Sequence, residues 1–235
     1  MKRGATTLLL VLFSLVGIDL SAQVPDSTKT KEYRWSIGIG LPLTVHRIFY
    51  KDSSIPDQYR FSAFSAPEAH VVYRFNKRAS LQGGIGYMGN TTNYQSTGMP
   101  NDGSGRMVIV DESYRSRTSV LTITGRFNLV NVNKRLPIYT IATLMPAYGT
   151  YRQTETWTHN NETTTQKDVK LSGVNMFAMA GFGFSYRTRK RLSGTVDVLL
   201  FRRNLTPNLP NYSRAYLIER YLIQSFSFGF NYGLR

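Results

Sequence analysis

The three histidines are the first places to look for chemistry, because a chain without cysteine has no thiol nucleophile and no thiolate ligand. They are His46, His70 and His159. A hydrolytic triad needs a hydroxyl nucleophile within reach of a histidine, and an acid that orients the ring. Neither His70 nor His159 has a serine two residues away on its own strand face, and sequence does not reveal a partner on another strand. Scattered histidines also give no metal-ligand spacing. We therefore expect a non-enzymatic protein without metal or cofactor.

Asp197 is the acid that stands deepest inside an alternating apolar segment. A carboxylate buried in such a position needs a partner. Arg126 and Arg74 lie on the inward side of their own segments by the same alternation. We expect an ion pair between Asp197 and Arg126 or Arg74 that fixes the interior, with a proton or ion pathway as the alternative.

The elements that position these residues are β-strands, because large apolar residues alternate with small or polar ones at both ends of the chain. The alternation runs from Tyr33 to Leu41 and from Leu222 to Leu234. Period two indicates strands with two different faces. Six further segments share the pattern: 69–75, 80–91, 118–130, 138–156, 167–187 and 192–203.

Glycine and serine lie opposite phenylalanine and tyrosine on these strands, which is typical of a narrow barrel with a lipid-facing wall. The sequence therefore predicts an all-β fold, an eight-stranded antiparallel transmembrane β-barrel with up-and-down connections. Aromatic residues near both strand ends favour two belts at the membrane surfaces. Tyr139 is expected in one belt, and Tyr148 and Tyr151 in the other.

A basic turn recurs between the strands and orients them. Arg78, Arg135 and Arg191 mark short turns, whereas segments 42–66, 92–117, 157–166 and 204–216 are longer. Outer-membrane barrels have short periplasmic turns and longer external loops. We expect both termini in the periplasm and the four long segments outside the cell.

The first residues predict export. Lys2 and Arg3 precede an apolar run from Leu8 to Val16, and small residues lead to Ala22. A basic start, a short apolar core and a small residue at the cut are the parts of a secretory signal peptide. We expect a signal peptide at 1–22 and one barrel domain at 23–235, with a retained anchor helix as the alternative.

The net charge of +15 favours an anionic partner. No nucleic-acid-binding motif accompanies the charge, so we expect no nucleic acid. Anionic lipid and lipopolysaccharide are the simpler partners of an exported protein. Lys170, Arg202 and Arg220 have the parity of lipid-facing residues near the external rim. We expect them to bind lipopolysaccharide phosphates; the alternative is a set of solvated charges.

The chain resembles outer-membrane β-barrel proteins of the OmpA and OmpX size class, often labelled porin-like and found in Gram-negative bacteria. The specific match is Ser227-Phe228-Gly229-Phe230-Asn231-Tyr232-Gly233-Leu234. This segment fits the family's C-terminal insertion signal, although the usual terminal aromatic is replaced by Leu234-Arg235. The resemblance implies that Gly229, Tyr232 and Leu234 are read by the barrel-assembly machinery after secretion.

Together these patterns favour an integral outer-membrane protein with a structural or loop-mediated surface-interaction role. Two alternatives remain. One is a lipid A-modifying enzyme, which the resemblance allows because small barrels include such enzymes. The other is an accessory component of an outer-membrane export or assembly machine. The sequence names no external ligand.

Overall fold

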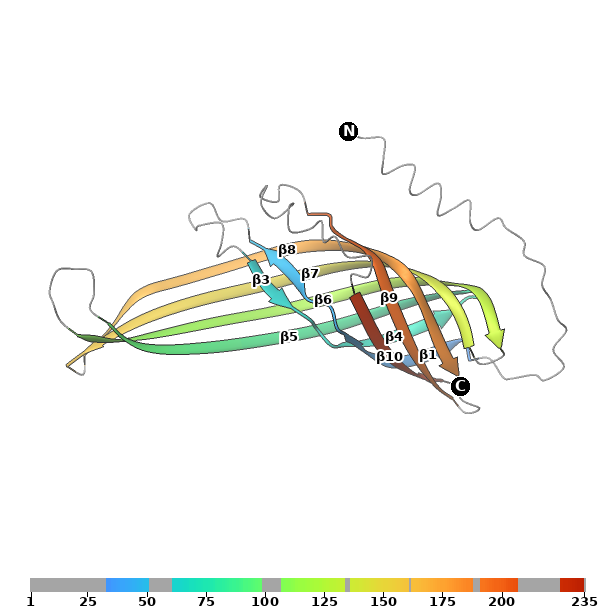
Figure 1. The fold of residues 1–235 in the computed structure, drawn as a ribbon, viewed down its shortest axis with the longest axis horizontal. Coiled ribbons are helices and arrows are strands. Elements are labelled where there is room, and N and C mark those ends of the chain that lie inside the picture. The colour runs from blue at the N-terminus through green and yellow to red at the C-terminus, as the bar shows by residue number, and fades with distance from the viewer. Residues whose placement is uncertain are drawn as a thin grey trace, which may run out of the picture. The chain divides into compact units, whose positions relative to one another are not determined.

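The computed structural model describes residues 33–50, 61–98, 107–133, 136–160, 162–187, 191–206 and 225–234. The expected signal peptide lies outside these residues. The regular structure within them is β-strand (Figure 1). The strands are β1 (Trp35–Pro42), β2 (His46–Phe49), β3 (Phe61–Phe64), β4 (Glu68–Arg74), β5 (Ala79–Gly98), β6 (Val108–Asn133), β7 (Leu136–His159), β8 (Glu162–Arg187), β9 (Leu192–Asn204) and β10 (Ser225–Gly233).

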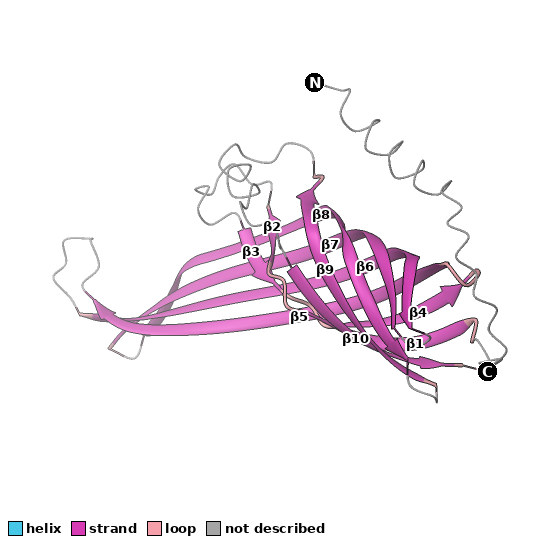
Figure 2. Cartoon of the chain, turned by 45° about the vertical axis from the view of Figure 1, so that its right-hand side comes forward, coloured by secondary structure: helices cyan, strands magenta, loops and turns pink. Residues whose placement is uncertain are grey.

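Eight of these strands form a closed antiparallel barrel in the order β1-β10-β9-β8-β7-β6-β5-β4, and β2 pairs with β3 in a separate hairpin (Figure 2). The expected eight-stranded fold is confirmed. The barrel closes where the first and last strands pair, from Ser36 opposite Gly233 to Pro42 opposite Ser227. The Leu234 amide donates a 2.8 Å hydrogen bond to the Trp35 carbonyl at the end of this seam.

The alternation in sequence becomes two different faces of the wall. Ile39 and Phe230, cross-strand partners at the seam, are 55% and 51% exposed on the outside. Inward positions such as Thr124 and Asn231 are buried. Two aromatic expectations were wrong: Tyr139 is only 2% exposed and faces the lumen, and Tyr151 packs against the buried core. Tyr148 is exposed on the outer face, as expected.

Four strands continue well past the barrel as a sheet (Figure 1). β1 has 8 residues and β10 has 9, whereas β6 and β8 have 26 each. A transmembrane strand needs only about 9–11 residues. At about 3.3 Å per residue, a strand as long as β6 spans roughly 85 Å. Much of segment 92–117, expected to be a loop, belongs to β5 and β6 because β-branched and aromatic residues there favour a pleated strand.

Segment 42–66 was expected to be a long external loop, and its described residues include the hairpin of β2 and β3. The described parts of that segment pack against the inner face of β7 and β8 at the long-loop end of the barrel, where Ile48 is fully buried and Tyr50 is 2% exposed. Room for them comes from the cross-strand glycines Gly149 and Gly173. A Cβ on Gly149 would lie 2.6 Å from Ile48 Cδ1, so only glycine fits there without rearrangement.

A β-bulge in β9 changes which residues face the lumen. Ala180 pairs with Phe201, and the next residue, Gly181, pairs with Leu199, so Leu200 is the extra residue. A bulge reverses the alternation beyond it. Arg202 therefore pairs with Met179, which is buried in the lumen, instead of pointing to the outside.

Candidate functional site

The interior ion pair forms in the middle of the barrel. Arg126 of β6 places its Nη2 atom 3.2 Å from the Asp197 Oδ2 atom of β9. The other carboxylate oxygen accepts a 2.7 Å hydrogen bond from the Tyr139 hydroxyl. The Arg126 guanidinium also lies 5.6 Å from the centre of the Tyr139 ring. Each carboxylate oxygen of Asp197 thus has a partner, whereas the buried Nε atom of Arg126 has no hydrogen-bond partner among the described residues. Hydrogen bonds to both groups offset part of the desolvation of a buried pair.

A second acid, Glu68 of β4, extends this network. Its carboxylate accepts 2.7 Å hydrogen bonds from the Gln82 side-chain amide and from the Thr122 hydroxyl. Gln82 in turn accepts a hydrogen bond from Arg126. The polar layer therefore runs across the lumen from β4 through β5 and β6 to β9.

His70 is the third partner of Glu68. Its Nδ1 atom lies 3.3 Å from Glu68 Oε1. Its Nε2 atom shares a 2.7 Å hydrogen bond with the Asn231 side chain of β10. Gly38 makes this contact possible, because a Cβ there would lie 2.5 Å from His70 Nε2. His70 is therefore a buried polar residue held by its neighbours, and it ties the closing strand to the network.

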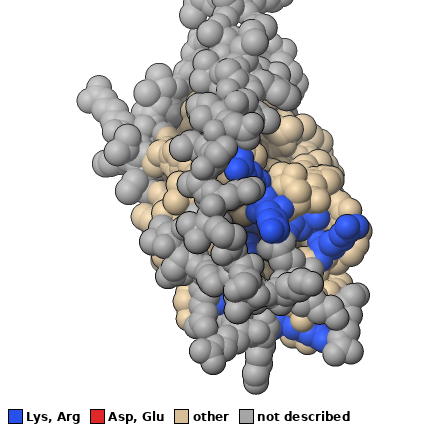
Figure 3. All heavy atoms as spheres, turned by 90° about the vertical axis from the view of Figure 1, so that its right-hand side faces the viewer, with Lys and Arg blue, Asp and Glu red and all other residues tan. Residues whose placement is uncertain are grey.

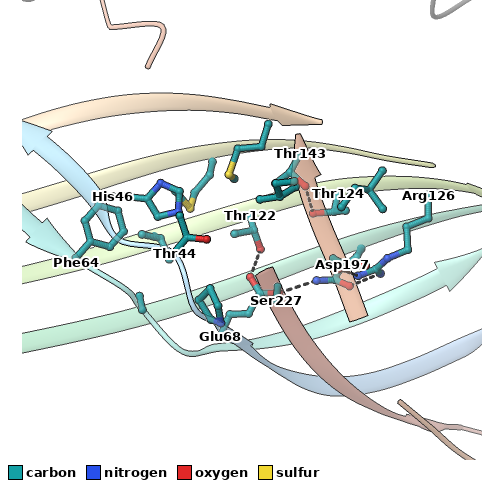
Figure 4. A pocket seen from close by; sticks show the side chains of 18 residues that line it. Thr44, His46, Phe64, Glu68, Thr122, Thr124, Arg126, Thr143, Asp197 and Ser227 are labelled. Atoms are coloured by element: carbon teal, nitrogen blue, oxygen red, sulfur yellow. Dashed lines mark hydrogen bonds and ion pairs between the residues drawn. The ribbon is translucent and has the colours of Figure 1, made fainter. Parts of the chain in front are cut away.

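A cavity of about 80 Å³ lies between this layer and the hairpin (Figure 4). His46 and Phe64 of the hairpin stand at one end of it, and Asp197 with Arg126 at the other (Figure 4). Its polar lining includes the Thr124 and Thr143 hydroxyls, which are 2.8 Å apart. Apolar side chains such as Ile141 and Met145 line the rest of it, and its volume leaves room for a few water molecules beside the polar groups.

The hairpin closes the other end of the cavity. The His46 ring packs between Phe64 and Phe177, with ring centres 5.3 and 5.2 Å away. Arg202 donates a 2.9 Å hydrogen bond to the Val45 carbonyl. The expectation that Arg202 points outward is therefore corrected: after the bulge it lies on the lumen side and holds the hairpin.

The arrangement offers little for hydrolysis. The only hydroxyl bound to Glu68 in the described network is that of Thr122, and it donates to the acid without contacting a histidine. His159 lies at a strand end, where its Nδ1 atom is 3.0 Å from the Met107 carbonyl. A nucleophile, a base and an orienting acid are thus not aligned in this part of the chain.

The short-turn end of the barrel is basic. Figure 3 looks onto this end, where Lys and Arg side chains, and no acidic ones, are seen among the described residues. A second cavity of about 60 Å³ opens between this end and the ion pair, lined by Arg74, Arg126 and Arg187 with several hydroxyl and amide groups. Arg74, the alternative partner for Asp197, thus lies on the other side of Arg126.

The expected insertion signal occupies the last strand. Gly229 is buried and faces Thr195, whereas Tyr232 is 47% exposed on the outer wall. The Arg191 guanidinium lies 5.5 Å from the Tyr33 ring centre and 5.9 Å from that of Tyr232. Leu234 is fixed by its backbone bond to Trp35.

The expected lipopolysaccharide rim is only partly assembled. Lys170 is 67% exposed on its side chain, on the outer face of β8. Arg202 faces the hairpin, and Arg220 lies outside the described residues. The structure therefore does not bring these three residues together.

Sequence reasoning missed Glu68, Gln82 and Asn175, which complete the interior. Glu68 stands two residues before His70, so strand parity alone could have placed both on the inner face. Asn175 shares the inward parity of its strand but gave no signal, because its partner is the distant hairpin backbone.

Comparison with known proteins adds little. No family model matches the sequence, and no curated protein matches it significantly. Among solved structures, Acinetobacter baumannii CarO2 is similar with a TM-score of 0.36 and 10% identity, over 85% of this chain and 98% of that one. Acinetobacter baumannii CarO gives a TM-score of 0.35 and 11% identity, over 88% of this chain and 100% of that one.

Proposed function

We propose that this chain is a non-enzymatic, integral outer-membrane protein whose external sheet binds extended segments of partner proteins. Support for the membrane comes from the wall, which exposes rows of Ile, Leu, Phe and Tyr and hides its polar groups. Such a wall is stable in lipid because a closed barrel satisfies its own backbone hydrogen bonds. The short basic turns and both termini face the periplasm in this proposal, after export and insertion by the secretion and barrel-assembly machinery.

The observation that carries the binding role is an open strand edge. β4 pairs with β5 only as far as Gly86, so Tyr87–Gly98 has a partner on one side alone among the described residues. This stretch contains no charged residue and no proline. Natural edges are usually blunted by lysine, proline or a bulge. An unprotected edge of this length is suited to accept another strand by main-chain pairing.

The closed lumen supports a surface role over transport. The hairpin closes one end of the interior cavity, and the polar layer with the Asp197–Arg126 pair closes the other. Eight strands in any case leave an interior just wide enough for side chains. Within the described residues, the external sheet therefore offers main-chain groups that are unpaired along the edge of β5.

Peptide arrays of extended segments test the proposal, with the purified barrel in detergent as the probe. Asn93→Lys adds a charge at the open edge of β5 and should abolish strand capture. Ser113→Lys is the matched control, because Ser113 is the cross-strand neighbour of Asn93 on the interior strand β6. Both variants lose the same 2.9 Å hydrogen bond between these side chains. Equal capture by both variants, or no capture by the unaltered protein, would refute the binding role.

The two alternatives have separate tests. A lipid A-modifying enzyme would change the mass of lipid A when its gene is deleted, whereas a binding protein would not. An accessory of an export machine would co-purify in fixed ratio with the machine from outer membranes. The open edge would serve that accessory role equally well, so the alternative differs in the partner and not in the surface.

A further inference from the structure

Three cationic side chains stand side by side on the outer face of the sheet. Arg115 of β6 pairs with Arg152 of β7, and Arg152 pairs with Lys170 of β8. All three side chains are exposed. Like charges directly opposite each other destabilise a sheet. A row of three is therefore an unfavourable arrangement for the protein alone, and an anion would relieve it.

Arg117 adds a fourth charge in the next row toward the barrel. It pairs with Thr150, which pairs with Ser172. These two rows alternate with inward residues, so their side chains share the outer face. The result is a patch of three guanidinium or ammonium groups above one guanidinium and two hydroxyls, all of which can donate to phosphate oxygens.

Asp168 is the acid that touches this patch. It accepts hydrogen bonds of 2.9 and 3.0 Å from Arg152 and lies 3.5 Å from Lys170. The bonds from Arg152 hold the pKa of the Asp168 carboxyl below its ordinary value. Asp168 orients the Arg152 fork but compensates only one of the four positive charges.

The height of the patch matches the lipid surface. The last apolar row of the wall includes Tyr87 and Tyr148, which flank Ser119 in register and are 56% and 51% exposed. Tyrosine rings sit at the headgroup level of a membrane. Arg117 is two residues farther along β6 than Ser119, and Arg115 is four, or roughly 7 and 13 Å along the strand.

We infer that Arg115, Arg117, Arg152 and Lys170 form a binding site for the phosphate groups of a lipopolysaccharide headgroup. Arginine suits this ligand because its planar fork gives two parallel hydrogen bonds to phosphate. The site shares only Lys170 with the rim expected from sequence. The inference rests on the proposed outer-membrane location, but it is independent of the strand-binding edge.

The test compares two charge-matched triple variants. Arg115→Gln with Arg152→Gln and Lys170→Gln removes the row. Arg34→Gln with Lys77→Gln and Arg78→Gln removes the same charge from exposed positions at the other end of the barrel. Each protein is folded into phosphatidylcholine vesicles with or without lipopolysaccharide, and bound lipid is counted by native mass spectrometry across a salt series.

We expect the row variant to lose about tenfold or more of the lipopolysaccharide retained, a change of about 1.4 kcal/mol, and the control to keep it. The unaltered protein should bind dephosphorylated lipopolysaccharide no better than the row variant binds intact lipopolysaccharide. Equal retention by both triple variants would overturn the site. Displacement of the lipid by millimolar inorganic phosphate would overturn the assignment to a headgroup in favour of free phosphate.

The vesicles without lipopolysaccharide separate this outcome from failure of the proposed function. Both variants should fold in vesicles without lipopolysaccharide and should fractionate with outer membranes in cells. In that case a loss of lipid binding refutes or supports only the phosphate site, and the proposed location still stands. A protein absent from outer membranes would instead refute the location on which the site depends.

Discussion

Asn175 of β8 and Phe49 of the hairpin are joined by two hydrogen bonds, although 126 residues separate them. The Phe49 amide donates to Asn175 Oδ1 at 3.2 Å, and Asn175 Nδ2 donates to the Phe49 carbonyl at 3.0 Å. The side-chain amide thus acts as a second neighbouring peptide group for β2, which is paired on one side with β3. Asn204 completes the cluster with a 2.8 Å bond to Asn175.

Asn175→Leu should therefore loosen the hairpin. The Phe49 peptide groups would lose their partners in a fully buried place, at about 1–3 kcal/mol for each unsatisfied group. Guanidinium unfolding in detergent should show the loss, and hydrogen exchange should rise at 46–50. Asn90→Leu, at an exposed position of β5, is the control. An unchanged exchange rate in the hairpin would contradict this role of Asn175.

The Asp197 ion pair predicts strong coupling between two substitutions. Asp197→Asn leaves Arg126 with an uncompensated charge and should lower stability by about 3–5 kcal/mol if the pair is dry. Arg126→Met combined with Asp197→Leu should recover much of that loss. A double-mutant cycle on the unfolding free energy measures the coupling. An Asp197→Asn protein with the original midpoint would show that water already screens the carboxylate.

Tyr232→Arg should block assembly of the barrel. The new charge would face lipid, at about 2–4 kcal/mol near mid-bilayer and less at the interface. It would also lie close to Arg191, which now contacts the Tyr232 ring. Tyr94→Arg, on the exposed end of β5, is the control and should assemble normally. Outer-membrane levels equal to the unaltered protein would argue against Tyr232 as part of the insertion signal.

Barrel closure predicts resistance to detergent. Unboiled protein should migrate differently from boiled protein on a gel and give a β-type circular dichroism spectrum, because every strand pair in the ring must be broken to unfold it. The mass of the protein recovered from membranes should correspond to a chain that begins at Gln23. A helical spectrum after export would refute the fold, and a retained N-terminus would refute the signal peptide.

The eight strands could be predicted because period two is a local property of the chain. The predicted bounds of the first and last strands agree with β1 and β10 to within a few residues, because alternating side chains in a strand point to opposite faces. The lengths of β5 and β6 were not predictable in the same way. The parts of β5 and β6 beyond the barrel are mostly polar on both faces and have no apolar stripe. Their sequences, rich in threonine and serine, therefore resemble those of loops.

The interior was predictable only in part. Parity placed Asp197 and Arg126 on the inner face, where the structure pairs them. The hairpin at the mouth of the barrel follows from contacts such as Ile48 with Gly149, which join residues far apart in the chain. The bulge at Leu200 also leaves no mark in the alternation, and each parity assignment beyond it is reversed.

Because Arg202 and Arg203 are adjacent, each face of the wall carries one arginine whether or not the alternation is reversed. With the bulge, Arg202 faces the hairpin, and Arg203 pairs with Ala178 on the exposed side. In a ladder without it, Leu200 would pair with Ala180, Arg202 would turn outward and Arg203 inward. Either register presents one arginine to the inner face of the wall and one to the outer face. A one-residue slip in the pairing of this half of β9 would therefore leave one positive charge on each face of the wall.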